Sequence, residues 1–268
     1  MRAAMHAGAS GSSAPYGLDI LWREVDEVFC LTLRTRPERR AAAERQLATV
    51  GLAERVSFLV QDADVEDGKR GCFHAHQEAA RVALSRGARR ALIFEDDIHF
   101  LPSFTPFAAA QVARFVRTAQ EPWHVFFLGH FPRRMELSAH AGVVKVSSMD
   151  AHAYIITETG MRDLSQLSYQ GEQVDVHYHY QCVFSYALYP MGVVQRPEFS
   201  DTEKVQRADD WNADKHAREH ALYRGCVGRQ MLAHVTVGGG EFDPYVYYVL
   251  NVQCMCTKSL KKLDQVGS

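Results

Sequence analysis

Three adjacent carboxylates, Glu95, Asp96 and Asp97, directly follow the apolar run 91–94 (ALIF). A run of this length is typical of a buried strand, so the acids are predicted at its carboxyl end, the edge where α/β sheets bind ligands. Carboxylates held this close repel one another unless a cation or water screens them. Their oxygens suit Mg²⁺ or Mn²⁺ bridging phosphates. The alternative interpretation is a solvated acidic loop or the first turn of a helix.

A basic loop is the second candidate site. The segment 25–33 (VDEVFCLTL) predicts a buried strand, and the segment 34–37 (RTRP) breaks it before a helix over 38–50. Guanidinium groups suit phosphate oxygens, so Arg39 or Arg40 is a candidate phosphate ligand. Alternatively, these arginines only decorate the surface of the helix.

An acidic loop follows the next strand. Residues 56–60 predict a second strand, parallel to the first through a right-handed crossover, and Asp62 and Asp64 come at its carboxyl edge. Their carboxylates can bind ribose hydroxyls there, or the loop is simply solvated. A helix over 75–85, ended by Gly87, then leads into the strand that carries the three acids.

Several features together resemble glycosyltransferase family 25, the group of lipopolysaccharide β-galactosyltransferases and collagen galactosyltransferase-like proteins. They are the glycine and cysteine at 71–72, His76 four residues after that cysteine, an alanine-rich helix, and the strand that ends in Glu-Asp-Asp. The segments 152–156 (HAYII) and 174–176 (VDV) extend the resemblance, which covers residues 25 to 200. The family typically has serine before the histidine, whereas this chain has Ala75 and therefore no hydroxyl there.

The resemblance implies a fold, a donor and a reaction. The fold is a GT-A type α/β fold, a Rossmann-like mixed sheet flanked by helices. The donor is a UDP-sugar held through Mn²⁺ or Mg²⁺, and its hexose, galactose or glucose, passes with inversion to a hydroxyl of a glycan or protein. The implied metal ligands are Asp97 and Glu95, and the implied general base is Asp175. The residues assigned to donor binding are Leu33, Arg34, Thr35, Arg39, Asp62, Gly71, Glu95 and Asp96.

Other interpretations of these residues stay open. Asp175 could instead cap the helix that begins there. His76, at the start of its predicted helix, is expected to hydrogen-bond loop backbone rather than a metal. His177 and His179 form a zinc cluster with Asp175 only on a strand, because residues two apart on a helix point to different faces. The chain can also be a catalytically inactive GT-A-like protein that binds a nucleotide sugar or a glycan, or a metal-dependent phosphohydrolase.

The amino-acid composition and net charge limit the classes of partner that the chain is expected to bind. The chain has 268 residues, 47% of them hydrophobic and 23% charged, an ordinary globular composition. A net charge of −2 offers no basic footprint for nucleic acid, and no segment resembles a membrane-spanning helix. The six cysteines are scattered and are expected to be reduced, in a cytoplasmic protein. We predict a disordered tail over 1–22 and a single glycosyltransferase domain over 23–268, with a nucleotide-sugar-binding half (23–130) and an acceptor-side half (131–268).

The remaining segments predict further helices and strands. His130 follows a predicted strand and is expected, with Arg133 and Arg134, to face the cleft. The predicted helices are 104–119, 159–167 and 208–224, and the predicted strands are 123–128, 143–146, 151–156 and 186–194. Beyond them, 238–240 is a predicted hinge and 245–252 is β-prone.

Overall fold

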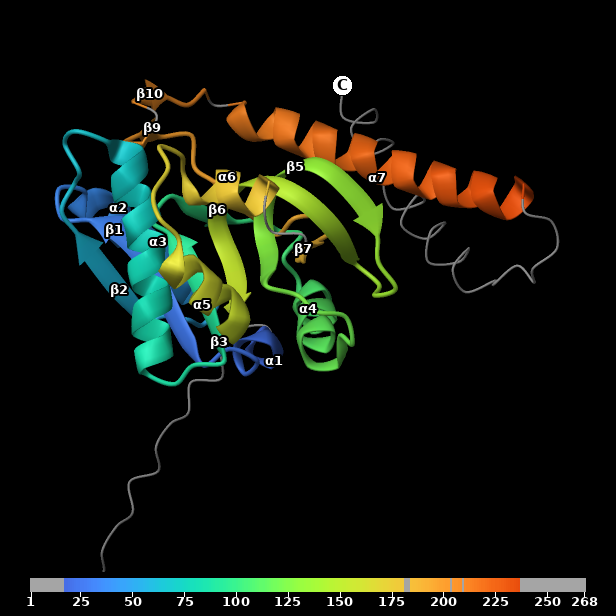
Figure 1. Cartoon of the computed structure of the whole chain (residues 1–268), viewed down its shortest axis with the longest axis horizontal. Coiled ribbons are helices and arrows are strands. Elements are labelled where there is room, and N and C mark those ends of the chain that lie inside the picture. The colour runs from blue at the N-terminus through green and yellow to red at the C-terminus, as the bar shows by residue number, and fades with distance from the viewer. Residues whose placement is uncertain (1–16, 181–183, 203, 209, 237–268) are drawn as a thin grey trace, which may run out of the picture. The chain divides into compact units, whose positions relative to one another are not determined.

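The computed structural model describes residues 17–180, 184–202, 204–208 and 210–236, with side chains described to residue 230. Its central feature is a six-stranded mixed sheet in the order β2-β1-β3-β6-β5-β7, with helices on both faces (Figure 1). The predicted α/β fold, a mixed sheet flanked by helices, is confirmed. A boundary between two compact units falls after Tyr223, inside helix α7 (Trp211–Thr236), and the sheet belongs to the first unit.

Three parallel strands form one half of the sheet. Strand β1 (Glu27–Leu33) pairs with β2 (Val56–Gln61) on one side and with β3 (Arg90–Glu95) on the other. The chain moves first to one side of β1 and then back across it, through helices α2 (Pro37–Thr49) and α3 (Gly68–Ser85). This reversal leaves a crevice beyond the carboxyl ends of β1 and β3, the place where open α/β sheets bind ligands.

Helix α3 starts earlier than predicted, at Gly68 rather than at Ala75. Asp67 caps it, because its carboxylate accepts the N–H groups of the second and third helical residues at 3.0 and 3.3 Å. The two additional turns carry Cys72 into the helix, one turn before His76. Both side chains therefore lie on one face of α3.

The other half of the sheet is built around antiparallel pairs. Strand β6 (Val143–Thr157) lies between β3 and β5 (Val125–Leu137) and is antiparallel to both, and β7 (Ser185–Leu188) completes the sheet. The prediction of separate strands at 143–146 and 151–156 is wrong. The pairing of β5 with β6 shifts register at several positions, and β6 continues through these shifts as one long strand.

The predicted strand over 186–194 is divided. Pro190 lies between β7 and the short strand β8 (Val193–Gln195), and proline has no N–H to donate to a ladder. Strand β8 pairs instead with β4 (Ile98–Phe100), which directly follows the three acids. This pairing brings Gln195 next to the acidic residues.

The apolar core lies mainly between the sheet and the helices of one face. Trp22 is buried in this core, and its indole N–H donates to the carbonyl of Val50 at 2.8 Å. The predicted tail over 1–22 is therefore corrected for its last residues, since the buried core begins at Leu18. The helices of this face are α1 (Asp19–Trp22), α2 and α4 (Pro106–Thr118), and those of the other face are α3, α5 (Glu158–Gln166) and α6 (Val174–Tyr180) (Figure 1).

A small hairpin precedes α7. It consists of β9 (Phe199–Ser200) and β10 (Val205–Gln206). Within the ranges given above, no helix has the length and apolar character needed to cross a bilayer. The predicted hinge at 238–240 and the β-prone segment 245–252 lie outside the described residues.

Candidate functional site

A cleft lies beyond the carboxyl ends of β1, β2 and β3 and contains about 840 Å³ of space open to solvent. Seven of the nine residues predicted to bind donor or metal line it: Leu33, Arg39, Asp62, Gly71, Glu95, Asp96 and Asp97. Arg34 and Thr35 do not line it. The Arg34 side chain is exposed, and its Nε donates to Asp62 Oδ1 at 2.8 Å. We call this space the donor cleft.

The wall opposite the strands comes from residues that the sequence analysis did not single out. Ser200, Thr202, Lys204 and Arg207 line it. This wall lies very close to the start of α3. A Cβ atom added to Gly68 would lie only 2.8 Å from the backbone carbonyl oxygen of Asp201. Glycine at that position therefore permits the contact.

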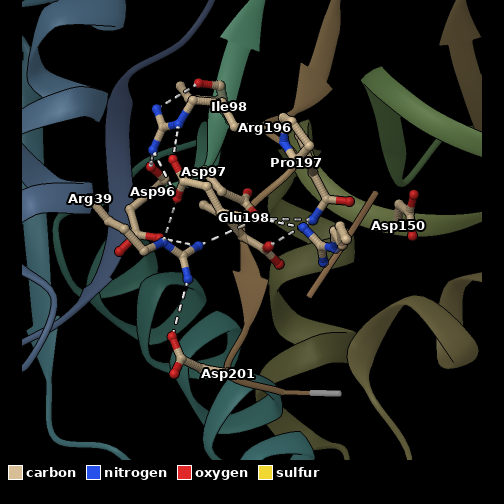
Figure 2. A network of polar contacts seen from close by, with 12 residues as sticks. Arg39, Asp96, Asp97, Ile98, Asp150, Arg196, Pro197, Glu198 and Asp201 are labelled. Atoms are coloured by element: carbon tan, nitrogen blue, oxygen red, sulfur yellow. Dashed lines mark hydrogen bonds and ion pairs between the residues drawn. The ribbon is translucent and has the colours of Figure 1, made fainter. Parts of the chain in front are cut away.

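Two arginines neutralise the acid pair Asp96 and Asp97. Arg39 Nη2 lies 2.5 Å from Asp96 Oδ1 and 3.4 Å from Asp97 Oδ2 (Figure 2). Arg207 Nη1 donates to Asp97 Oδ2 at 2.7 Å. The four side chains are at most 13% exposed, so water screens these ion pairs only weakly. The other oxygen of Asp97, Oδ1, is buried and has no hydrogen-bond partner among the described residues.

The turn that carries the acids is held by its backbone. The backbone N–H of Arg196 donates to the carbonyl of Asp97 at 2.6 Å, and the Arg196 guanidinium donates to the carbonyl of Asp96 at 2.8 Å (Figure 2). Burial raises the pKa of the Asp96 carboxyl to about 6, although the neighbouring Arg39 charge opposes this shift. The acidic turn is thus fixed independently of any ligand.

Glu95 faces a different set of partners. His76 Nε2 lies 3.2 Å from Glu95 Oε1, and Gln195 donates to Glu95 Oε2 at 3.4 Å. Burial alone would raise the pKa of Glu95, but the His76 hydrogen bond and nearby positive charge lower it to about 2. His76 Nδ1 lies 2.8 Å from the hydroxyl of Tyr154. His76 therefore contacts two side chains, and the expected contact with loop backbone is wrong.

A second, smaller cavity lies next to the donor cleft and contains about 390 Å³ of space. Asp175 lines it, and five residues are common to both spaces: Cys72, Glu95, Ser200, Thr202 and Arg207. Asp175 Oδ2 accepts the backbone N–H of Asp150 at 3.1 Å, and Oδ1 accepts that of Val176 at 2.9 Å. Burial raises the pKa of Asp175 to about 6. We call this space the Asp175 cavity.

The position of Asp175 bears on its alternative role as a helix cap. A capping residue precedes the first helical residue and accepts an N–H two or three residues ahead. Helix α6 already begins at Val174, and Asp175 accepts the N–H of the very next residue. This contact differs from the usual cap.

A chain of polar contacts links the two spaces. Lys215, on α7, contacts the carboxylate of Asp150 and donates to Gln195 Oε1 at 3.1 Å. Gln195 in turn donates through Nε2 to Asp97 Oδ2 at 3.3 Å. None of these contacts is marked by a local sequence motif, and Gln195 and Lys215 were not predicted as site residues.

Three other histidines do not form the sites that were considered for them. His130 is fully buried, and burial lowers its pKa to about 3, so it does not face the cleft as expected. It lies inside β5, 3.5 Å from Glu219. His177 and His179 lie on the helix α6, where their spacing separates them. The only cluster of metal-ligating side chains in the described part of the chain lies elsewhere, at Cys72, His76 and Glu95.

The donor cleft has the chemistry to hold a hard divalent cation. Six carboxylates line it, and three of them, Asp62, Asp64 and Asp201, are paired with arginines that do not line it. The other three are Glu95, Asp96 and Asp97. These three adjacent acids would repel a diphosphate placed beside them unless a cation accompanied it. No described residue offers a hydrogen-bond partner to Asp97 Oδ1, and carboxylate oxygens are the ligands that Mg²⁺ and Mn²⁺ prefer. Asp97 and Glu95 therefore fit such an ion.

Comparison with known proteins gives a partial similarity. No protein-family model matches the chain. The chain is 26% identical over 129 residues to the probable inactive glycosyltransferase 25 family member 3 of Rattus norvegicus, and 26% identical over 132 residues to the inactive glycosyltransferase 25 family member 3 of Homo sapiens. Each match covers 39% of this chain and 22% of the relative, so the chain spans about a fifth of the length of these curated relatives.

Three solved structures show a distant likeness. Mannose-1-phosphate geranyltransferase from Thermus thermophilus has a TM-score of 0.41 at 12% identity, over 61% of this chain and 74% of that one. UDP-glucose pyrophosphorylase complexed with UDP-glucose has a TM-score of 0.40 at 12% identity, and the match covers 78% of this chain and 86% of that one. A glycosyltransferase involved in the glycosylation of the major capsid of PBCV-1 has a TM-score of 0.40 at 8% identity, and the match covers 73% of this chain and 100% of that one. Likeness at this level carries no functional argument, and the fold rests on the topology described above.

Proposed function

We propose that the chain is a glycosyltransferase of family 25 that transfers a hexose, galactose or glucose, from a UDP-sugar to a hydroxyl of a glycan or protein acceptor. One observation carries the proposal. The acids 95–97 and the loop after β1 converge on a single cleft at the reversal of strand order. Such crevices bind nucleotides in open α/β sheets. The partial similarity to family 25 proteins supports the same assignment.

In this proposal the donor cleft holds the UDP-sugar by its diphosphate. Asp97 and Glu95 would hold Mn²⁺ or Mg²⁺, which when bound neutralises charge on the departing diphosphate. Arg39 and Arg207 lie next to the acids, so their guanidinium N–H groups can donate to phosphate oxygens bound there. Asp62, exposed at the cleft, suits the hydroxyls of a ribose.

Asp175 is the proposed general base. In an inverting transfer the acceptor oxygen attacks the anomeric carbon, the bond to the diphosphate oxygen breaks, and the acceptor proton passes to a base on the opposite face. Asp175 lies across the shared wall from the donor cleft. A pKa of about 6 leaves its carboxylate ionised at neutral pH and still able to accept a proton. The acceptor hydroxyl would then enter through the Asp175 cavity.

A binding protein without turnover is the second candidate function. Ala75 lines the donor cleft where the resembled family has a serine, so a hydroxyl is missing from the wall. The curated relatives named above are described as inactive or probably inactive. A chain of this kind would keep the donor cleft and its carboxylates but would release no UDP from a bound donor.

Melting temperatures separate these possibilities first. We expect UDP and Mn²⁺ together to raise the melting temperature more than either alone, because a ligand that binds only the folded state stabilises it. The lack of any joint effect would contradict donor binding. UDP release from UDP-galactose or UDP-glucose would then identify the enzyme, whereas a joint shift without release would identify the binding protein. Release of inorganic phosphate from simple esters would instead indicate a phosphohydrolase.

A further inference from the structure

Cys72, His76 and Glu95 form a compact cluster in the wall between the donor cleft and the Asp175 cavity. One ligand atom of each residue, a thiol sulfur, an imidazole nitrogen and a carboxylate oxygen, lies within 4.8 Å of the other two. Cys72 and His76 are one turn apart on α3, and Glu95 ends β3. Cys72 and Glu95 line both spaces, whereas His76 is fully buried and lines only the donor cleft.

We propose that Cys72, His76 and Glu95 bind a thiophilic divalent cation such as Zn²⁺, at a site different from that of the hard donor cation. Thiolate and imidazole ligands favour Zn²⁺ and Co²⁺, whereas Mg²⁺ and Mn²⁺ favour oxygen ligands alone. Three protein ligands with a fourth position left for water are the usual arrangement of an accessible zinc site. The open space on both sides of Cys72 and Glu95 provides room for that water.

The distances suit such an ion. Zinc bonds of about 2.0–2.1 Å at a tetrahedral angle place a nitrogen and an oxygen ligand about 3.3 Å apart. His76 Nε2 and Glu95 Oε1 are already 3.2 Å apart. A sulfur ligand must lie about 3.6 Å from the other two. The Cys72 sulfur lies within 4.8 Å of a ring nitrogen of His76 and of a carboxylate oxygen of Glu95, so a side-chain rotation that brings it up to about 1.2 Å closer gives the separation required.

Tyr154 supplies the outer contact that a ligating histidine requires. Its hydroxyl lies 2.8 Å from His76 Nδ1, and the hydroxyl of Tyr178 donates to it at 3.4 Å. A hydroxyl can donate or accept, so Tyr154 supports His76 both when Nε2–H donates to Glu95 and when Nε2 holds a metal and Nδ1–H donates. On binding, the imidazole keeps one proton and the Cys72 thiol releases its proton to solvent.

The site has a consequence for the donor that rests on the proposed function, although the binding itself does not. Glu95 is also assigned to the hard cation of the donor cleft. A thiophilic ion held by Cys72, His76 and Glu95 would withdraw that carboxylate, so Zn²⁺ should oppose Mn²⁺-dependent donor binding.

Cobalt absorption tests the site without any donor. The full chain, reduced and freed of metal by a chelator, is titrated with Co²⁺. We expect a near-ultraviolet thiolate-to-cobalt band, together with the visible bands of a tetrahedral ion, and we expect Zn²⁺ to abolish both. Because this readout needs no sugar donor, it can fail while the proposed function stands, and it can succeed while that function fails. Absence of the thiolate band in the unaltered chain would overturn the proposal.

Three variants test the thiolate ligand, a control cysteine and the outer contact. Cys72→Ser should remove the thiolate band, whereas Cys226→Ser, which changes a cysteine of the second compact unit, should keep it. Tyr154→Phe should keep the band but weaken Co²⁺ binding by roughly ten- to a hundredfold, the usual effect of losing an outer contact. Melting temperatures measured on the same samples show whether each variant is folded. A band that persists in folded Cys72→Ser would contradict the site.

Discussion

The donor cleft and the Asp175 cavity share a wall, yet their carboxylates are held in different ways. In the cleft, Asp96 and Asp97 each lie within ion-pairing distance of a partly buried arginine. In the cavity, Asp175 accepts two backbone N–H groups and has no ion pair with any described residue. The first arrangement holds fixed negative charge in position for a cation. Burial raises the pKa of both Asp96 and Asp175 to about 6, but only the Asp175 carboxylate has no arginine partner in the described part of the chain, so it is the one placed to exchange a proton near neutral pH.

Asp97→Asn should produce the largest effect, because it removes a negative charge from the cleft that is assigned to the metal-bound donor. The carboxamide keeps the shape but loses the charge that a hard cation requires, so Mn²⁺-dependent UDP binding should become undetectable. Calorimetry with UDP in Mn²⁺ measures this loss. Asp19→Asn, on α1, is the matched control and should bind UDP normally. Undiminished UDP affinity in folded Asp97→Asn would remove the acids from the donor site.

Asp175→Asn tests the other region and should spare the donor. If Asp175 is the general base, the transfer rate should fall by roughly 10²–10⁴-fold with donor affinity nearly unchanged, because a base contacts the acceptor. Turnover and UDP affinity are measured on the same preparation. If Asp175 only caps α6, turnover should stay nearly intact, since asparagine caps about as well as aspartate. If Asp175→Asn weakened donor binding, the assignment of the donor to one space and of Asp175 to the other would be contradicted.

The same variant makes a prediction about pH and stability. The Asp175 carboxyl titrates near pH 6 in the folded chain and near pH 3.9 in the unfolded chain. The folded state therefore holds the proton more tightly, and stability from this group is present below about pH 4 and lost as pH rises to about 6. The loss is on the order of 3 kcal/mol. Asp175→Asn should remove this part of the pH dependence of the unfolding free energy, and an unchanged profile would contradict the shifted pKa.

Arg207→Gln should have a smaller effect that depends on the metal. It leaves Asp97 with Arg39 and Gln195, so we expect a loss of about 1–3 kcal/mol in the free energy of unfolding. Mn²⁺ should then raise the melting temperature of this variant more than that of the unaltered chain, because the ion replaces the missing charge. Arg40→Gln, which breaks an exposed pair with Glu44 and a cation–π contact with the Phe58 ring, should cost about 1 kcal/mol. An equal Mn²⁺ effect in all three proteins would count against Asp97 as a ligand.

The parts of the fold that local patterns encode were predictable. The apolar run before Glu95 and the break at 34–37 before α2 are signals within a few residues of sequence, and the strands predicted from such signals match β1, β2 and β3. Parallel pairing of three such strands then brings their carboxyl ends to one edge. This is why seven predicted residues line the same cleft.

The opposite wall was not predictable in this way. Arg207 reaches Asp97 across 110 residues of sequence, and Gln195 reaches it across 98. The Gln195 contact depends on the pairing of β8 with β4, which no local pattern marks. His130 was misplaced for a related reason, because β5 continues to Leu137, beyond the predicted end of the strand at 128. Long-range strand pairing, rather than local propensity, decides both cases.

A calorimetric donor screen tests the central claim most directly. The unaltered chain is titrated with UDP-galactose, UDP-glucose and nucleotide sugars with other bases, each with Mn²⁺ and again with a chelator. Because the three adjacent acids Glu95, Asp96 and Asp97 line the donor cleft, a diphosphate should bind there only together with a divalent cation. We predict binding of UDP-galactose or UDP-glucose in Mn²⁺ and none in the chelator. Binding that is equally tight without metal, or no binding of any UDP-sugar, would contradict the assignment of the Glu95-Asp96-Asp97 cleft to a metal-held donor.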